Sequence, residues 1–166
     1  MLEYATILPT SEGRACIACD IKGGVCVVKF RCRTSKSTAS VADQEHEIWT
    51  MVYKEMPSKL CTLNDRNALI MPYARPISRE DLRSMKDEFE KLLKTISRVK
   101  LNTGYTQYTE DDEAEEESGG YVEHACLKLK HFGLYEVGGA VKTGRPIIFD
   151  FGNLNLHKTP EAALVL

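Results

Sequence analysis

The sequence predicts an α+β fold, in which strands and helices occupy separate stretches of the chain. Three patterns support this class. Strand-like apolar runs fill residues 4–32, two helical periodicities cover residues 41–56 and 78–99, and a glycine-containing hairpin pattern spans residues 131–151. With 166 residues, the chain is long enough to bury the core of one ordinary domain, or of a small lobe and part of another.

The first stretch predicts a β-meander. Residues 4–8, 14–21 and 25–32 are apolar runs rich in valine, isoleucine and cysteine, as in strands. The Lys-Gly-Gly sequence at residues 22–24 separates the last two runs, and glycine pairs favour tight hairpin turns.

The middle of the chain predicts a helix followed by a hairpin. Residues 41–56 carry apolar side chains at helical spacing, and Pro57 follows where such a helix would end. Two short apolar runs, residues 60–63 and 68–71, then flank an Asn-Asp-Arg-Asn sequence that favours a turn.

A second, longer helix is the clearest element of the sequence. Ser78 stands three residues before Asp81, which is the spacing of a capping box, and residues 82–99 continue one apolar stripe over five turns or more. We expect residues 103–120, which include the acidic run, to form a mobile loop because they offer almost nothing to bury.

The last third predicts an irregular segment and a second hairpin. The pattern of residues 121–130 fits no regular element, and we interpret it as a loop. Residues 131–137 and 145–151 are strand-like and flank two glycine-containing turns, so they predict a hairpin.

Composition excludes several classes of protein. Apolar residues make up 43% and charged residues 28% of the chain, and the net charge of -2 favours neither nucleic acid nor a membrane as partner. Seven of the 24 acidic residues lie in residues 110–117, so 17 acidic and 22 basic residues remain, a balance of +5. No signal peptide or membrane-spanning stretch is evident, and we expect a cytoplasmic protein.

The six cysteines predict reduced thiols rather than a disulfide framework. Most lie inside apolar runs, where free cysteine is commonly buried. Cys16 and Cys19 have zinc-like spacing, but no second pair accompanies them, and in a strand their side chains would point to opposite faces. We therefore expect no zinc site.

A candidate metal site lies near the end of the chain. Residues 147–149 form a buried strand pattern, and Asp150 follows directly. Gly152 offers backbone freedom where the strand ends, so Asp150 is expected at a strand mouth, where it could hold a metal ion and phosphates.

Residues 150–152, Asp-Phe-Gly, resemble the metal-binding motif of protein kinases, in which the aspartate holds Mg²⁺ against the nucleotide phosphates. Upstream, Val25-Cys-Val-Val-Lys-Phe30 resembles the kinase Val-Ala-Ile-Lys strand, which implies that Lys29 contacts phosphates. The family pairs this lysine with a glutamate of the next helix, and here Glu45, or alternatively Glu47, fills that role.

The resemblance extends over residues 4–154 and implies a kinase organisation. Residues 67–74 resemble the strand that enters the hinge, with Met71 as gatekeeper and Tyr73 and Ala74 near an adenine. Only Gly13 remains of the glycine-rich loop, so nucleotide binding is expected to be weak or absent. The implied parts are an N-lobe at residues 1–72, a hinge at 73–77, and a partial C-lobe at 78–166 with an acidic mobile loop at about 103–120.

Departures from the kinase pattern imply that catalysis is lost. Residues 121–131 align with the His-Arg-Asp-Leu-Lys-x-x-Asn loop through His124, but Cys126 replaces the catalytic aspartate and His131 the metal-binding asparagine. An alternative register, with His131 in the histidine position, puts Gly133 and Gly138 at those positions. No catalytic residue is expected in either register.

The resemblance therefore implies a truncated, catalytically inactive kinase-like domain, a pseudokinase that acts by binding. The apolar side of the second helix would lack its usual cover, which the chain's own residues 159–166, a second copy or a different protein would supply; the helix side chains are Phe89, Leu92, Leu93, Ile96 and Val99. We expect no tight cofactor, at most weak binding of Mg-ATP, and a protein partner or a homodimer at this face.

Two other interpretations remain open. The chain could be a divergent ATP-dependent phosphotransferase, in which Lys29 and Asp150 hold Mg-ATP and Glu123 is the base. It could also be a small α+β domain unrelated to kinases.

Overall fold

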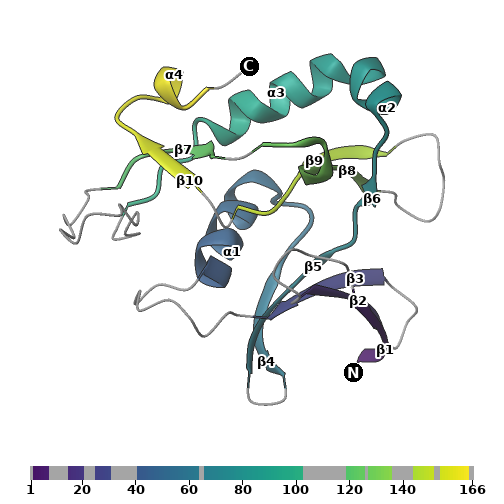
Figure 1. Cartoon of the computed structure of the whole chain (residues 1–166). Helices are drawn as coiled ribbons and strands as arrows, with labels where there is room; N and C mark the ends of the chain where they lie inside the picture. Colours follow the sequence, from purple (N-terminus) through teal and green to yellow (C-terminus); the bar gives the residue numbers. More distant parts are fainter. Residues whose placement is uncertain are drawn as a thin grey trace. The chain divides into compact units, whose positions relative to one another are not determined.

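The structure is a computed structural model that describes residues 2–7, 15–20, 25–30, 41–63, 66–102, 119–125, 127–135, 144–151 and 154–164. These residues form two compact units, Met1–Tyr73 and Ala74–Leu166 (Figure 1). Both combine helices with small antiparallel sheets, which confirms the α+β class. Several predicted features lie outside the described residues: Gly13, the turn at 22–24, the acidic run at 110–117, Cys126, Gly138 and Gly152.

The first unit contains a five-stranded antiparallel sheet with the strand order β1-β2-β3-β5-β4. Its strands are β1 (Leu2–Ile7), β2 (Ala15–Asp20), β3 (Val25–Phe30), β4 (Lys59–Leu63) and β5 (Arg66–Pro72). β1, β2 and β3 pair in sequence order, which confirms the meander, and β4 pairs with β5 as the predicted hairpin. β5 also pairs with β3, so the hairpin extends the meander sheet.

Helix α1 (Val41–Val52) packs against β4 and β5 of this sheet. Its side chains Ile48 and Trp49 are fully buried and form the core of the unit with Tyr53 and Met56. The helix ends before residue 56, the predicted end, because the Met56 N–H bonds to the Tyr53 carbonyl in a turn. The Trp49 indole N–H donates to the Met56 carbonyl at 2.6 Å. The apolar side chains therefore keep helical spacing beyond the end of α1, in a turn whose side chains face the same core.

The opposite face of the sheet has a smaller apolar cluster around Val28 and Ala68, which are fully buried. Cys26 and Cys61 pack against it and are half-buried. The expectation of reduced cysteines stays a prediction.

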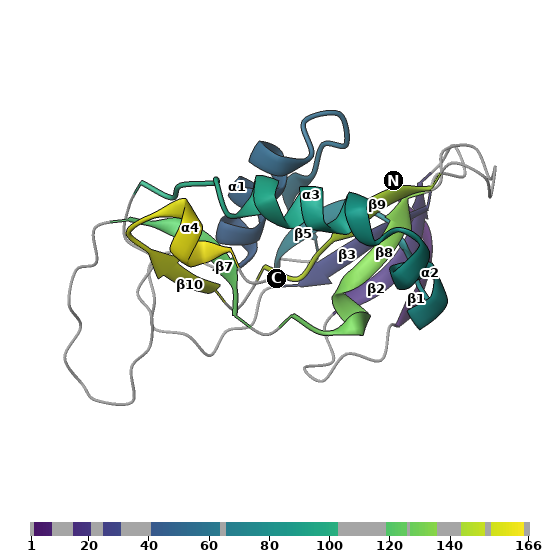
Figure 2. The same cartoon turned by 90° about the horizontal axis from the view of Figure 1, so that it is seen from above.

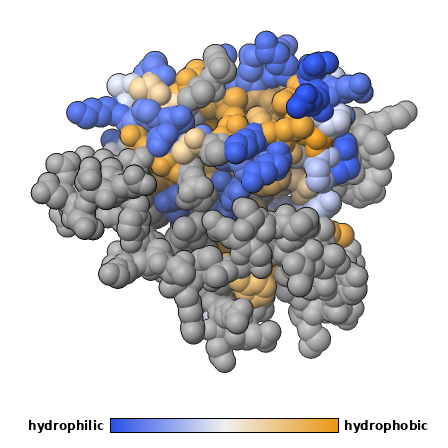
Figure 3. Space-filling view, viewed as in Figure 1, coloured by the Kyte–Doolittle hydropathy of each residue, from blue (hydrophilic) through white to orange (hydrophobic). Residues whose placement is uncertain are grey.

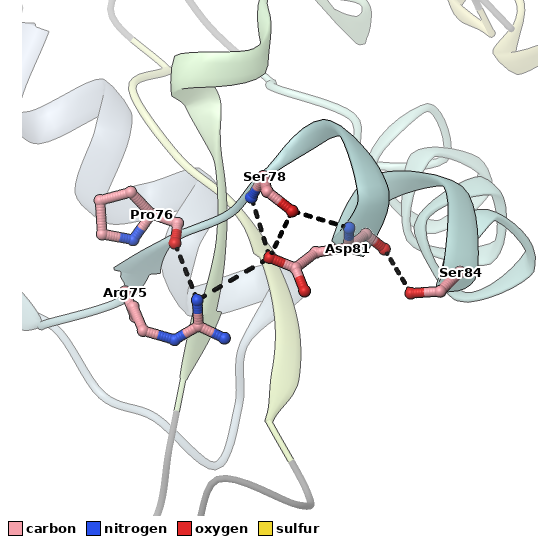
Figure 4. Close-up of polar contacts among 5 residues, drawn as sticks. All are labelled: Arg75, Pro76, Ser78, Asp81 and Ser84. Atoms are coloured by element: carbon pink, nitrogen blue, oxygen red, sulfur yellow. Dashed lines mark hydrogen bonds and ion pairs between the residues drawn. The ribbon is translucent and has the colours of Figure 1, made fainter.

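The second unit begins with α2 (Arg79–Ser84), which has the predicted capping box. Figure 4 shows Ser78 Oγ accepting the Asp81 N–H at 3.0 Å, while the Ser78 N–H donates to Asp81 Oδ2 at 2.9 Å. The Ser78 backbone N–H, followed by the Ser78 hydroxyl and the Arg75 guanidinium, lowers the pKa of Asp81 below its ordinary value.

The prediction of a single long helix is wrong, because the helical stretch is broken at Met85 into α2 and α3 (Lys86–Ile96). Met85 has φ -112° and ψ 27°, outside the helical region. Ser84 Oγ donates to the Asp81 carbonyl at 2.9 Å, the same carbonyl that accepts the Met85 N–H. Such side-chain bonding within a helix is known to bend it, and here the helix changes direction.

Two further sheets complete the second unit. β6 (Arg75–Pro76), β8 (Phe132–Tyr135) and β9 (Arg145–Ile148) form one, and β8 with β9 is the predicted hairpin. β7 (Tyr121–His124) and β10 (Leu154–His157) form the other. The loop predicted at residues 121–130 is therefore partly wrong, since it contains β7 and the short 3-10 helix η1 (Leu129–His131). β10 was not predicted.

The apolar side of α3 packs within this unit. Phe89, Ile96 and Val99 are buried, and the Phe89 ring meets the Phe132 ring edge-to-face at 5.1 Å. Figure 2 shows α3 running alongside β9, with the short helix α4 (Pro160–Ala163) beside β7 and β10. The chain itself therefore covers these three side chains, as one of the alternatives left open by the sequence allowed; a protein partner or homodimer at this face stays a prediction.

A β-bridge joins the chain before and after residues 103–118. Lys100 pairs with Tyr121, the Leu101 N–H donates to the Gly120 carbonyl at 3.0 Å, and the Val122 N–H donates to the Val99 carbonyl at 3.0 Å. A side chain at Gly119 would meet the Leu101 carbonyl oxygen at 1.7 Å, so only glycine fits this crossing.

Candidate functional site

Lys29 and Glu45 form a buried ion pair in the first unit. Lys29 Nζ lies 2.7 Å from Glu45 Oε1 and 3.0 Å from Oε2, so both carboxylate oxygens accept from one ammonium group. The Glu45 side chain is 2% exposed and that of Lys29 22%. Because strand side chains alternate, Val28 enters the smaller apolar cluster while Lys29 reaches α1 on the other face.

The strand register places Met71 on the same face as this pair. Lys29 stands opposite Leu69, and Val27 stands opposite Met71, and residues directly opposite each other share a face of a sheet. Met71 is 3% exposed and belongs to the core, whereas Tyr73 is half-buried after the end of β5. The roles of Met71 and Tyr73 toward a nucleotide stay predictions.

Asp150 lies two residues after β9, at the strand mouth that the sequence predicts. Its φ is 69°, in the left-handed region that non-glycine residues rarely adopt, and its side chain is 51% exposed. Backbone freedom was expected at Gly152, but among the described residues the strained position is Asp150 itself. Such strain concentrates at functional sites, where the surrounding structure holds the residue in place.

Two histidines flank the backbone around Asp150. The His131 carbonyl accepts the Phe149 N–H at 3.0 Å, and His124 Nε2 lies 3.1 Å from the Phe149 carbonyl. The centroids of the two imidazole rings lie 4.8 Å apart with their planes tilted by 38°, and the His124 ring also lies 5.8 Å from the Phe151 ring. His124 is 8% exposed and His131 5%. Both neighbours of Asp150 are therefore held in place, which stabilises its strained conformation.

The hydrogen-bond partners determine which nitrogen of each histidine carries the proton. The Lys128 N–H donates to His131 Nδ1 at 3.0 Å, so Nδ1 has the lone pair and Nε2 the proton; Nε2 lies 3.6 Å from Asp150 Oδ2. The Phe149 carbonyl only accepts, so His124 Nε2 donates to it. The other nitrogen of His124, Nδ1, is buried without a hydrogen-bond partner.

A third polar cluster, which the sequence analysis missed in part, joins β7 and β10. His157 Nε2 donates to Glu123 Oε2, and Asn155 Nδ2 lies 3.4 Å from the same oxygen. The sequence analysis considered Glu123 as a base but not its two partners. The alternation of Leu154, Asn155, Leu156 and His157 is the strand signal that could have revealed them.

A cavity of about 280 Å³ lies in the second unit between α3, β7 and α4. Its walls are mainly apolar, and Ser97, Glu123 and His124 add polar groups; the apolar residues include Leu93, Ile96, Val122, Leu127 and Ala163. Ala163 belongs to the C-terminal stretch proposed from sequence as a cover for the helix. No helix within the described ranges is long and apolar enough to cross a membrane.

A family model described as "Family of unknown function (DUF5898)" matches residues 8–116 of the 166, which include Lys29, Glu45 and Met71 but neither His131 nor Asp150. No curated protein matches the chain. Since the matched residues make up more than half of the sequence, the protein belongs to the DUF5898 family.

Proposed function

We propose that the protein is a catalytically inactive, protein kinase-like domain that acts by binding another protein. The observation that carries this proposal is the buried pair of Lys29 and Glu45, which joins the third strand of an antiparallel sheet to its one described helix. A lysine and a glutamate in this arrangement are expected of a kinase N-lobe. The strand order β1-β2-β3-β5-β4 is compatible with that arrangement.

The second unit adds support in the order of its elements. A helix is followed by β7, by the hairpin of β8 and β9, and then by Asp150 at a strand end. This is the order in which the resemblance expects the C-lobe helix, the catalytic loop and the metal motif. Asp150 combines partial exposure with backbone strain, as expected of a site residue rather than of an ordinary turn.

Inactivity is inferred from the residues that stand at the positions of the kinase base and metal-binding asparagine in the sequence. In the first register Cys126 replaces the catalytic aspartate, and a thiol cannot reproduce a carboxylate that orients the attacking hydroxyl and accepts its proton. His131 replaces the asparagine, and an imidazole is a poor ligand for Mg²⁺, which prefers oxygen donors. In the alternative register both positions are glycines, so neither register supplies a base.

We place the partner-binding surface at the cavity between α3, β7 and α4. Its walls include Leu93, Ile96, Leu127 and Ala163, and a volume of about 280 Å³ can admit an apolar side chain of a partner. Burying one leucine or phenylalanine there would contribute roughly 1.5–3 kcal/mol. Where Figure 1 draws α3 and β8, the space-filling view shows apolar atoms among hydrophilic ones (Figure 3).

One set of assays tests inactivity. The purified chain is incubated with γ-labelled ATP, Mg²⁺ or Mn²⁺ and a general protein substrate, and incorporated label is counted for the wild type, Lys29→Ala and Asp150→Ala. We expect no label above background in any of them. Transfer by the wild type that Asp150→Ala abolishes would contradict the proposal.

Sedimentation tests the binding surface. A dimer that Leu93→Glu dissociates would assign the surface to a second copy of the chain. If the wild type stays monomeric, the partner is a different protein. Leu93→Glu then serves as the variant that should not bind this partner.

A second candidate, the divergent phosphotransferase, is favoured by one observation. Glu123 and His157 form a carboxylate–imidazole pair, a combination that can serve as a general base. Label transfer that is lost in Glu123→Gln and His157→Asn would select this candidate over the binding function.

A further inference from the structure

The resemblance to kinases assigns a divalent cation to Asp150, and the donors around this carboxylate allow that assignment to be tested. A histidine binds a metal ion through a nitrogen lone pair, which requires the proton to be on the other nitrogen. The Lys128 N–H points at Nδ1 of His131 at 3.0 Å and so keeps the lone pair on that nitrogen. The nitrogen that faces Asp150 carries the proton.

His131 therefore presents an N–H, and not a ligand, to the carboxylate. Its Nε2 lies 3.6 Å from Asp150 Oδ2, too long for a direct hydrogen bond but close enough for attraction between an N–H dipole and a carboxylate. A cation bound to Oδ2 on this side would meet the positive end of the N–H. Binding through Nε2 would instead require the proton to move to Nδ1, against the Lys128 N–H.

His124 does not supply a metal ligand beside Asp150 either. His124 Nε2 donates to the Phe149 carbonyl at 3.1 Å, so this nitrogen also carries a proton. Its lone-pair nitrogen, Nδ1, is buried from solvent. Neither imidazole thus offers an accessible lone pair beside Asp150 in this arrangement.

The surroundings fix both rings in these tautomers. His131 is 5% exposed and His124 8%, and the centroids of the two rings lie 4.8 Å apart. Phe149 is tied to both histidines, through its N–H to the His131 carbonyl and through its carbonyl to His124. Turning either imidazole over would break a hydrogen bond in a buried place.

We propose that the His131 N–H takes the place of a divalent cation at Asp150, so that the chain itself supplies the positive partner of this carboxylate. Within the described part of the chain, the two histidines beside Asp150 do not fit Mg²⁺, Mn²⁺ or Zn²⁺ as ligands at this position. This inference rests on the proposed function and refines it: any nucleotide that the protein binds would bind without a metal ion.

The direct test is the tautomer of His131 in the wild-type chain. Two-bond ¹H–¹⁵N correlation spectra distinguish a protonated imidazole nitrogen from one with a lone pair, and His131→Gln assigns the signal. We expect Nδ1 unprotonated and Nε2 protonated. A signal with the proton on Nδ1 would overturn the inference.

Metal binding provides the second test. Mn²⁺ is titrated into the full chain, and the loss of the free-ion electron paramagnetic resonance signal is followed; Zn²⁺ is tested by thermal shift. We expect no saturable Asp150-dependent site in the wild type. In His131→Asn, whose amide oxygen can face the carboxylate, Mn²⁺ affinity should rise at least tenfold, and Asp150→Asn in that background should remove the gain.

The control is His157→Asn, which removes a histidine that contacts Glu123 and leaves the Asp150 surroundings unchanged. It should leave Mn²⁺ affinity as in the wild type. Two outcomes overturn the inference: a wild-type Mn²⁺ or Zn²⁺ site that Asp150→Asn abolishes, or a folded His131→Asn with unchanged affinity. Both are independent of phosphoryl transfer and of partner binding, so the inference and the proposed function can fail separately.

Discussion

Replacing Lys29 by methionine should destabilise the first unit strongly, because it leaves the Glu45 carboxylate buried without its cation. Over the 2.7 Å between Nζ and Oε1, the attraction at an effective dielectric constant near 20 is about 6 kcal/mol, most of which offsets the desolvation of the two charges. Removing one partner of a buried pair costs about 3–5 kcal/mol. Because the Lys29 side chain is 22% exposed, water partly compensates and we expect about 3 kcal/mol.

The measurement is urea unfolding followed by tryptophan fluorescence. Trp49 is the only tryptophan of the chain and is fully buried on α1, one turn after Glu45, so its emission reports on the first unit. Lys59→Met is the matched control, because Lys59 is an exposed lysine of β4 and should change stability by no more than about 0.5 kcal/mol.

A double-mutant cycle separates the ion pair from other effects of the substitution. Lys29→Met combined with Glu45→Met removes both charges, and we expect the double variant to recover most of the lost stability, since apolar replacement of a buried pair is often neutral. The reasoning is refuted if Lys29→Met costs no more than Lys59→Met, or if the coupling energy in the cycle is below about 0.5 kcal/mol.

Three further predictions concern the second unit. Ser78→Ala should lower the free energy of unfolding by about 1 kcal/mol through loss of the helix cap, measured by denaturant titration, whereas an unchanged midpoint would show that the cap contributes nothing. Because the pKa of Asp81 is lowered in the folded state, its contribution to stability is present above its ordinary pKa of 3.8 and is lost as the pH falls; the stability difference between wild type and Asp81→Asn should therefore shrink from pH 7 to pH 2, and a constant difference would contradict this. Asp150→Gly should be about 1 kcal/mol more stable than Asp150→Ala, because glycine adopts a φ of 69° without strain; equal melting temperatures would argue against strain at this position.

Local patterns allowed several elements to be predicted from the sequence. The capping box of Ser78 and Asp81 involves residues three apart, and its hydrogen bonds form within one turn. The hairpin of β8 and β9 likewise follows from two strand-like runs around glycine-containing turns. These features depend on residues that are close together in the chain, so the sequence alone shows the pattern that predicts them.

Features that depend on distant partners could not be predicted. β10 has only four residues, and its register on β7 pairs Leu154 with His124, thirty positions earlier in the chain. The break at Met85 leaves the apolar periodicity of residues 82–99 intact, so the hydrophobic pattern gives no sign of it. Sequence alone pointed to Asp150, but the proton on His131 Nε2 depends on the Lys128 N–H, which only the folded structure brings to that ring.

Because of the bridge between Lys100 and Tyr121, we expect the fold to tolerate changes in the length of the segment that the bridge encloses. Backbone hydrogen bonds of the residues on either side fasten both ends of residues 103–118 at one crossing. Doubling the length of such a closed segment costs only about 0.6 kcal/mol in chain entropy. The position therefore suits the insertion of an epitope tag or a fluorescent reporter, with Gly119 retained as the residue that allows the crossing.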